Sequence, residues 1–166
     1  MKAYMTKGTV DFLVKLSKKH ALDIYIMNNN EGGLAYYEDA KKSIFTTGKD
    51  YEIITQNGEM QAEGFVVMNN IPVTDDARAV FEDRFKARRS DVDSMPGFQA
   101  FRFLRPLKGN HYVVLTQWNS ASDFDNWKNS ETFQKAHQNQ EVKKPAYYAD
   151  RPFTTSYQMY VEEENS

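Results

Sequence analysis

Apolar and polar residues alternate along four short stretches in the second half of the chain, which is the pattern of half-buried β-strands. These stretches are residues 64–69, 98–105, 112–118 and 153–161. Residues 74–89 instead place apolar side chains three or four positions apart after Thr74, a residue type that favours helix starts. Two shorter helical segments are expected at residues 121–128 and 131–139. The order is therefore β-α-β-β-α-β, which is that of ferredoxin-like proteins.

The first half of the chain has a similar but shorter pattern. Strands are expected at residues 2–6, 22–27 and 34–38. Residues 9–20 have helical spacing, with Phe12, Leu13 and Leu16 on the expected buried face. Residues 40–62 are polar, contain turn signals, and are expected to hold one or two short strands. The first half therefore resembles a truncated copy of the second, in the order β-α-β-β.

A four-stranded sheet that carries helices on one face must bury its other face against another layer. Two such sheets placed face to face close a barrel, and no stretch rich in Pro, Gly or Ser separates the two halves. We therefore predict an α+β, ferredoxin-like barrel closed within one chain. Its truncated N-terminal half is residues 1–62 and its complete C-terminal half is residues 63–166. A chain that closes its own barrel needs no second copy, so we expect a monomer.

Composition and charge exclude several classes of protein. The 166 residues include 21 Lys and Arg against 23 Asp and Glu, a net charge of −2, which argues against a nucleic-acid partner. The absence of Cys excludes disulfides, thiolate metal sites and a cysteine nucleophile. No apolar run approaches the roughly 20 residues of a membrane span, and the N-terminus lacks the apolar core of a secretory signal. We therefore expect a cytoplasmic protein with no membrane partner.

Aromatic residues make up 14% of a chain whose mean hydropathy is −0.72. This composition suits either an aromatic core or a pocket for a large flat ligand. Of the three histidines, His20 ends the first predicted helix and His111 lies at a predicted hairpin turn, so a structural or solvated role is expected for both. His137 lies on a short helix, where a lone histidine is also more often structural.

The spacing of Trp127 and His137 bears on this choice. On one continuous helix these side chains would lie about 15 Å apart and point in different directions. Ser130 is a favourable first residue for a new helix, so a break in the helix is expected there. With this break, both side chains can face the sheet and the interior between the two halves.

Residues 69–74, 113–118 and 127–137 resemble segments of the IsdG-type heme-degrading enzymes, which have an antibiotic biosynthesis monooxygenase domain. The similarity extends along nearly the whole chain to the longer HmoB-type members. It includes residues 4–13, 96–98 and 103–107. The resemblance implies that residues 63–166 form such a domain.

The resemblance also implies a heme site built from Asn69, Trp127 and His137. His137 would be the axial ligand of the heme iron, a role that suits a neutral imidazole. Asn69, on the same side of its strand as Phe65, would donate a hydrogen bond to the heme in the interior between the halves. Trp127 would press on the porphyrin and distort it. Phe65 and Phe133 would line the same cavity.

The implied activity is that of a heme-degrading monooxygenase, for which heme is both cofactor and substrate. O2 is activated reductively, the porphyrin ring is opened and iron is released. An external electron donor, such as a reductase, must supply the electrons, because the chain has no nucleotide-binding fingerprint.

Several alternatives remain open from the sequence. Asn70 competes with Asn69 for the polar role, because a shift of one residue turns a side chain to the opposite face of a strand. Arg84, Arg88 and Arg105 are candidates for contacts to the heme propionates by charge alone. The same fold group also includes a staphylococcal signalling protein, the target of RNAIII-activating protein. A heme carrier or a cofactor-free monooxygenase acting on a quinol-like substrate would fit the same fold.

Overall fold

The structure, a computed structural model, describes residues 1–87, 92–131, 133–134 and 148–162. The first half consists of β1 (Lys2–Gly8), α1 (Val10–Lys18), β2 (Tyr25–Asn29), β3 (Gly32–Asp39) and β4 (Lys49–Gly58). The second half consists of β5 (Phe65–Pro72), α2 (Arg78–Ala87), β6 (Phe98–Pro106), β7 (His111–Trp118), α3 (Ala121–Lys128) and β8 (Phe153–Met159). Short 3-10 helices at Asp75–Ala77 and Val92–Ser94 lie on either side of α2 along the chain.

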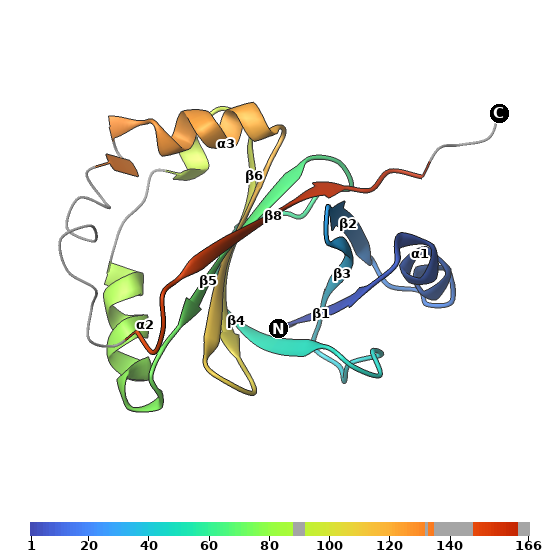
Figure 1. The fold of residues 1–166 in the computed structure, drawn as a ribbon, viewed down its shortest axis with the longest axis horizontal. Helices are drawn as coiled ribbons and strands as arrows, with labels where there is room; N and C mark the ends of the chain where they lie inside the picture. The colour runs from blue at the N-terminus through green and yellow to red at the C-terminus, as the bar shows by residue number, and fades with distance from the viewer. Residues whose placement is uncertain (88–91, 132, 135–147, 163–166) are drawn as a thin grey trace.

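The strands form a closed barrel in the order β1-β3-β2-β8-β5-β7-β6-β4, and all neighbouring strands are antiparallel. Each half arranges its own strands in the same way, as β4-β1-β3-β2 in the first and β8-β5-β7-β6 in the second. Figure 1 shows α1 outside the barrel on one side and α2 and α3 on the opposite side. The predicted fold class, a ferredoxin-like α+β barrel closed within one chain, is confirmed.

The first half differs from the second by one helix. Residues 40–48 join β3 to β4 without a helix, whereas α3 lies between β7 and β8. β4 is a single strand of 10 residues, longer than the short strands expected from the polar sequence of this region. It pairs with β1 on one side and with β6 on the other, so it joins the two halves.

Alternate side chains of the strands fill the interior of the barrel. Tyr36, Tyr51 and Tyr157 meet several methionines there, and every residue of this cluster is at most 7% exposed. The buried Arg102 donates from Nε to Oε2 of Glu38 at 2.6 Å. The protein's own side chains therefore occupy the space between the halves, and the predicted ligand cavity at that place is wrong.

The helices pack on the outer face of the barrel. α1 begins after Thr9, whose hydroxyl oxygen accepts a hydrogen bond from the N–H of Phe12 at 3.2 Å. Leu13 is buried under α1, but Phe12 is 58% exposed, so its predicted place on the buried face is wrong. Val10 and Val14 pack against the sheet instead.

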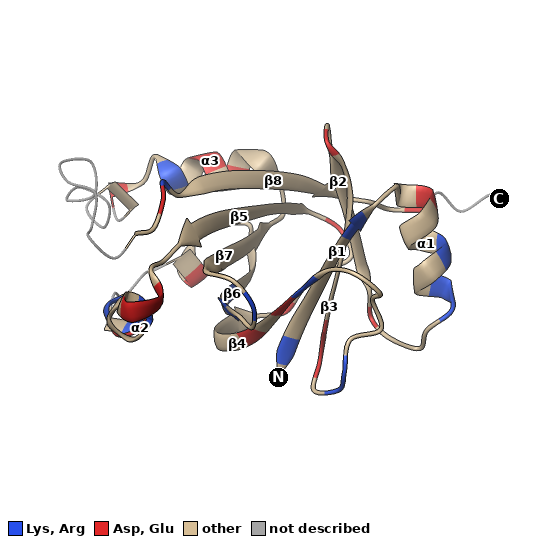
Figure 2. Ribbon diagram, turned by 60° about the horizontal axis from the view of Figure 1, so that its bottom comes forward, with Lys and Arg blue, Asp and Glu red and all other residues tan. Residues whose placement is uncertain are grey.

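Charges of both signs lie on the surface of the helices. Figure 2 shows acidic and basic residues interspersed on α1 and α2, in keeping with the net charge of −2. Within the described ranges, no helix has the length and apolar character needed to cross a membrane.

Candidate functional site

β5 divides its side chains between the barrel interior and the outer face of the sheet. Val66 and Met68 belong to the interior cluster, whereas Phe65 and Val67 pack in a separate cluster with residues of α3. Asn69 follows Phe65 and Val67 in the same alternation. The side of β5 that carries Phe65, Val67 and Asn69 therefore faces the helices. The prediction that this side faces the interior between the halves is wrong.

Aromatic side chains from β5, β6, β7 and the α3 region gather on this outer face. They are Phe65, Phe98, Phe101, Trp118, Phe124, Trp127 and Phe133. The ring planes of Trp118 and Trp127 are inclined by 27°, with centroids 6.5 Å apart, and Phe133 meets Trp127 edge-on at 5.6 Å. The structure thus brings Phe65, Trp127 and Phe133, the residues expected to line a flat-ligand cavity, into one cluster.

The chain breaks its helix after α3, as the sequence indicated. The Ser130 hydroxyl donates to the main-chain oxygen of Trp127 at 2.6 Å and accepts from the N–H of Phe133 at 3.2 Å. Ser130 thereby ends one helical segment and begins the next, which turns Phe133 back toward Trp127. His137, the expected iron ligand, lies outside the described residues.

The two neighbouring asparagines of β5 have different surroundings. The amide nitrogen of Asn70 donates to the main-chain oxygens of Met68 and Phe153 and to Oγ1 of Thr155, each at 3.3 Å. The amide of Asn69 is half-buried and has no hydrogen-bond partner in the part of the chain that the structure describes. A half-buried amide without a partner is available to a ligand. The geometry therefore favours Asn69 over Asn70 as a ligand-binding residue.

Glu82 joins α2 to the sheet. Its carboxylate accepts hydrogen bonds from Arg105 Nη2 at 2.6 Å, from Arg105 Nε at 2.9 Å and from the hydroxyl of Tyr112. The hydrogen bonds from Arg105 hold the pKa of Glu82 below its usual range, although burial acts in the opposite direction. Arg105 is thus engaged within the protein, which argues against a contact with a heme propionate. Of the other candidates, Arg84 lies in the last turn of α2 and Arg88 lies outside the described residues.

Trp118 is a member of the site that the sequence reasoning did not single out. It is fully buried and lies opposite Phe65 in the β5–β7 register. Its indole N–H donates to Oγ1 of Thr116 at 2.9 Å. Thr116 and Trp118 share a face of β7, and this spacing of two was the only signal in the sequence that could have linked them.

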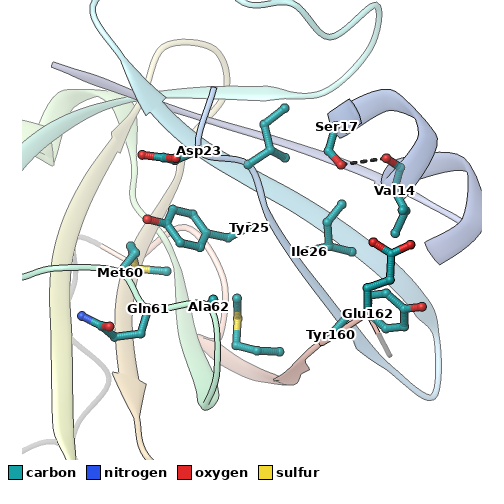
Figure 3. Close-up of a pocket in the computed structure, with 12 residues that line it drawn as sticks. Val14, Ser17, Asp23, Tyr25, Ile26, Met60, Gln61, Ala62, Tyr160 and Glu162 are labelled. Atoms are coloured by element: carbon teal, nitrogen blue, oxygen red, sulfur yellow. Dashed lines mark hydrogen bonds between the residues drawn. The ribbon is translucent and has the colours of Figure 1, made fainter. Parts of the chain in front are cut away.

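A separate cavity lies on the other side of the molecule. It has a volume of about 440 Å³ and lies between α1, β2 and the chain that follows β8 (Figure 3). Asp23, Tyr25, Gln61 and Glu162 contribute polar groups to its lining. Its lining includes no residue of the aromatic cluster or of the site expected from the sequence.

Comparison with known proteins agrees with the fold. The family model for antibiotic biosynthesis monooxygenases matches residues 64–139, which span β5 to the segment beyond α3. Residues 64–139 thus match the model of this domain. The resemblance stated from the sequence is confirmed for this domain.

Similar proteins carry two kinds of name. A heme-degrading monooxygenase of Listeria monocytogenes is 23% identical over 130 residues, which cover 78% of each chain. The signal transduction protein TRAP of Staphylococcus aureus is 23% identical over 133 residues, 80% of each chain. A solved structure of a major regulator of staphylococcal pathogenesis has a TM-score of 0.84 at 21% identity, covering 97% of this chain and all of that one. At this identity the structural likeness supports the fold alone.

Proposed function

We propose that the protein is a heme-degrading monooxygenase that binds heme on the outer face of β5, beside α3. The observation that carries the proposal is the placement of Trp127 and Phe65 on the face of β5 that also carries Asn69, whose amide has no partner among the described residues. Aromatic rings on the same face of the sheet as an amide that has no partner among the described residues fit a flat, largely apolar ligand with polar edges. The Listeria relative named as a heme-degrading monooxygenase supports the same assignment.

Each residue of the proposed site has a distinct task. His137 would ligate the heme iron, and the amide of Asn69 would donate a hydrogen bond to the heme. Trp127 presses on the porphyrin plane and Phe65 extends the aromatic surface at the other end of the cluster. When bound, the heme supplies iron for O2 chemistry, with electrons from an external reductase, and it is consumed by ring opening and iron release.

We also propose that the protein acts as a monomer in the cytoplasm. Each of the barrel strands pairs with two neighbours from the same chain, so no strand edge is left for a second copy. Size-exclusion chromatography with light scattering tests this: the expected mass is that of one chain, 19.3 kDa.

Addition of hemin to the purified protein tests the function. A shifted Soret band, followed by its loss when a reductant is added in air in the presence of catalase, is the expected result.

His137→Ala should abolish or greatly weaken axial ligation, whereas Trp127→Phe should keep heme binding and slow ring opening. An unchanged heme spectrum in His137→Ala would overturn the assignment of the iron ligand. Loss of absorbance that catalase blocks would indicate free peroxide chemistry instead of turnover at the site.

A signalling protein is the second candidate, because TRAP covers 80% of this chain at 23% identity. That role requires no heme, so the absence of any Soret shift would favour it. A shift followed by stable absorbance under reductant would instead indicate a heme carrier. Without a Soret shift, oxidation of an added quinol in air would indicate a cofactor-free monooxygenase.

A further inference from the structure

Trp118 of β7 lies against Trp127 and limits how its ring can tilt. The two ring planes are inclined by 27° with centroids 6.5 Å apart, which is an offset, near-parallel arrangement. Trp118 is fully buried and Trp127 is 7% exposed, so Trp118 is the inner member of the pair. A change in the tilt of Trp127 would push its ring into Trp118 or open a void between them, and close-packed interiors oppose both.

Trp118 is itself firmly placed. Its Nε1 donates to Oγ1 of Thr116 at 2.9 Å, which fixes the ring about its long axis. Phe98 and Phe124 meet the indole edge-on, with centroids at 5.9 and 6.0 Å. A hydrogen bond and two rings thus hold Trp118 in place. Because the ring of Trp127 packs against this fixed ring, Trp118 restricts the position of Trp127.

We propose that Trp118 is a positioning residue, which sets the plane of Trp127 and thereby the angle at which Trp127 meets a bound porphyrin. This inference rests on the proposed function. Distortion of a porphyrin depends on the side chains that press on it, and a misplacement of about 1 Å at a reacting centre can cost about 10²-fold in rate. Since Trp118 acts through Trp127, its loss should change where and how fast the ring opens more than how tightly heme binds.

The tryptophan pair can be tested without heme. The chain has 2 Trp residues, so its indole circular dichroism arises from Trp118 and Trp127 alone. Two indoles at this separation and angle couple, and the expected signature is a pair of bands of opposite sign. Trp118→Phe and Trp127→Phe should each remove this couplet, and Thr116→Val should reduce it because the Trp118 ring is no longer fixed. A wild-type protein without a couplet would overturn the geometry on which the proposal depends.

The second part of the test uses the heme-loaded protein. Trp118→Leu should lower the rate of ring opening about tenfold and change the ratio of ring-opened isomers, with heme affinity changed less than threefold. Trp118→Phe should restore part of the wild-type ratio, because a ring again supports Trp127. Phe103→Leu is the matched control: it removes an equally buried ring from the separate cluster beneath α2, which includes neither Trp118 nor Trp127, and the isomer ratio should stay as in the wild type.

The outcomes separate this proposal from the proposed function. If the wild type shows the couplet but binds or degrades no heme, the proposed function fails, and the reactive role of Trp118 fails with it. If the wild type degrades heme and folded Trp118→Leu gives the wild-type isomer ratio, Trp118 is core packing only and the proposal is overturned. An equal change of the ratio in Phe103→Leu would also overturn it, because any loss of a buried ring would then have the same effect.

Discussion

The two half-sheets have the same strand order, but their outer faces are covered by different segments of the chain. In the second half, α2 and α3 cover β5, β6 and β7, and the amide of Asn69 lies half-buried on this face with no partner among the described residues. In the first half, α1 covers one part of the face, and residues 40–48 lie where a second helix would follow β3. We call this segment the 40–48 cover. It covers the outer face of the first half-sheet, and the corresponding face of the second half-sheet carries the proposed site.

Hydrogen bonds fix the 40–48 cover to the strands beneath it. The hydroxyl of Tyr4 donates to the main-chain oxygen of Lys41, and the hydroxyl of Thr6 donates to that of Thr47 at 2.7 Å. Both Tyr4 and Thr6 belong to β1, which occupies in the first half the place of β5 in the second. Their polar groups are thus satisfied by the protein itself.

Rings close the rest of this face. Tyr37 of β3 accepts a hydrogen bond from the N–H of Ile44 at 2.9 Å and meets Phe45 edge-on at 5.2 Å. Tyr4 and Tyr37 are themselves in contact, with ring centroids 5.0 Å apart. The two sheets have one topology but different covers: the cover of the first half satisfies the polar groups below it, whereas the amide of Asn69 in the second half has no partner among the described residues.

The largest expected effect comes from Asn69 and Asn70, which lie on opposite faces of one strand. Asn69→Ala removes the proposed donor to heme, and we expect turnover to fall about 10²-fold with little change in stability, since no bond to a described residue is lost. Asn70→Ala breaks the bonds to Phe153 and Thr155 and should cost about 1 kcal/mol of unfolding free energy, with turnover unchanged. Steady-state assays and urea unfolding measure the two effects. The reverse outcome would assign the polar role to Asn70.

This pair also shows what the sequence could and could not predict. The alternation of Phe65, Val67 and Asn69 was readable because strands have a period of two. Which side faced the helices was not, because Val66 and Met68 are as apolar as Phe65 and Val67, and both faces of β5 are buried. The distinction between the two asparagines needs the contacts of Asn70 with β8, which lies more than 80 residues away along the chain.

Helix faces and the tryptophan pair show the same limit. The stretch of residues 9–20 was correctly expected to be helical, but Phe12 lies outside and Val10 and Val14 lie inside, since a shift of one position turns a helix by about 100°. The break at Ser130 could be predicted because capping is local. The stacking of Trp118 on Trp127 could not, because it depends on how α3 returns to the sheet.

The second prediction compares how the helices of the two halves are anchored. Glu82 anchors α2 through its hydrogen bond with Arg105, and the pKa of Glu82 is lowered in the folded protein. The ionised carboxylate therefore adds its full contribution to the unfolding free energy above the unfolded-state pKa of about 4.3. That contribution is lost as the pH falls through the lower folded-state pKa. Glu82→Gln should therefore lower the unfolding free energy by about 1–2 kcal/mol at neutral pH and by progressively less below about pH 4. Urea unfolding from pH 7 to pH 3 measures this.

The matched control for Glu82 lies in the first half. Thr9→Ala removes the N-cap of α1, a bond between a hydroxyl and the N–H of Phe12 that involves no titrating group. It should lower the unfolding free energy by about 1 kcal/mol at every pH in that range. If Glu82→Gln showed the same flat profile, the ionised carboxylate would not be what anchors α2.

The smallest expected effect tests whether the 40–48 cover is purely structural. Tyr37→Phe removes the acceptor of the Ile44 N–H while keeping the ring that packs against Phe45, so the unfolding free energy should fall by about 1 kcal/mol. Heme affinity, ring opening and a stoichiometry of one heme per chain should not change, because the proposed site lies on the other half-sheet. A hemin titration of this variant beside the wild type measures the stoichiometry directly. A second bound heme would show that the cover alone keeps the first half from binding the same ligand, whereas a changed affinity at one heme per chain would show that the two faces are coupled through the barrel.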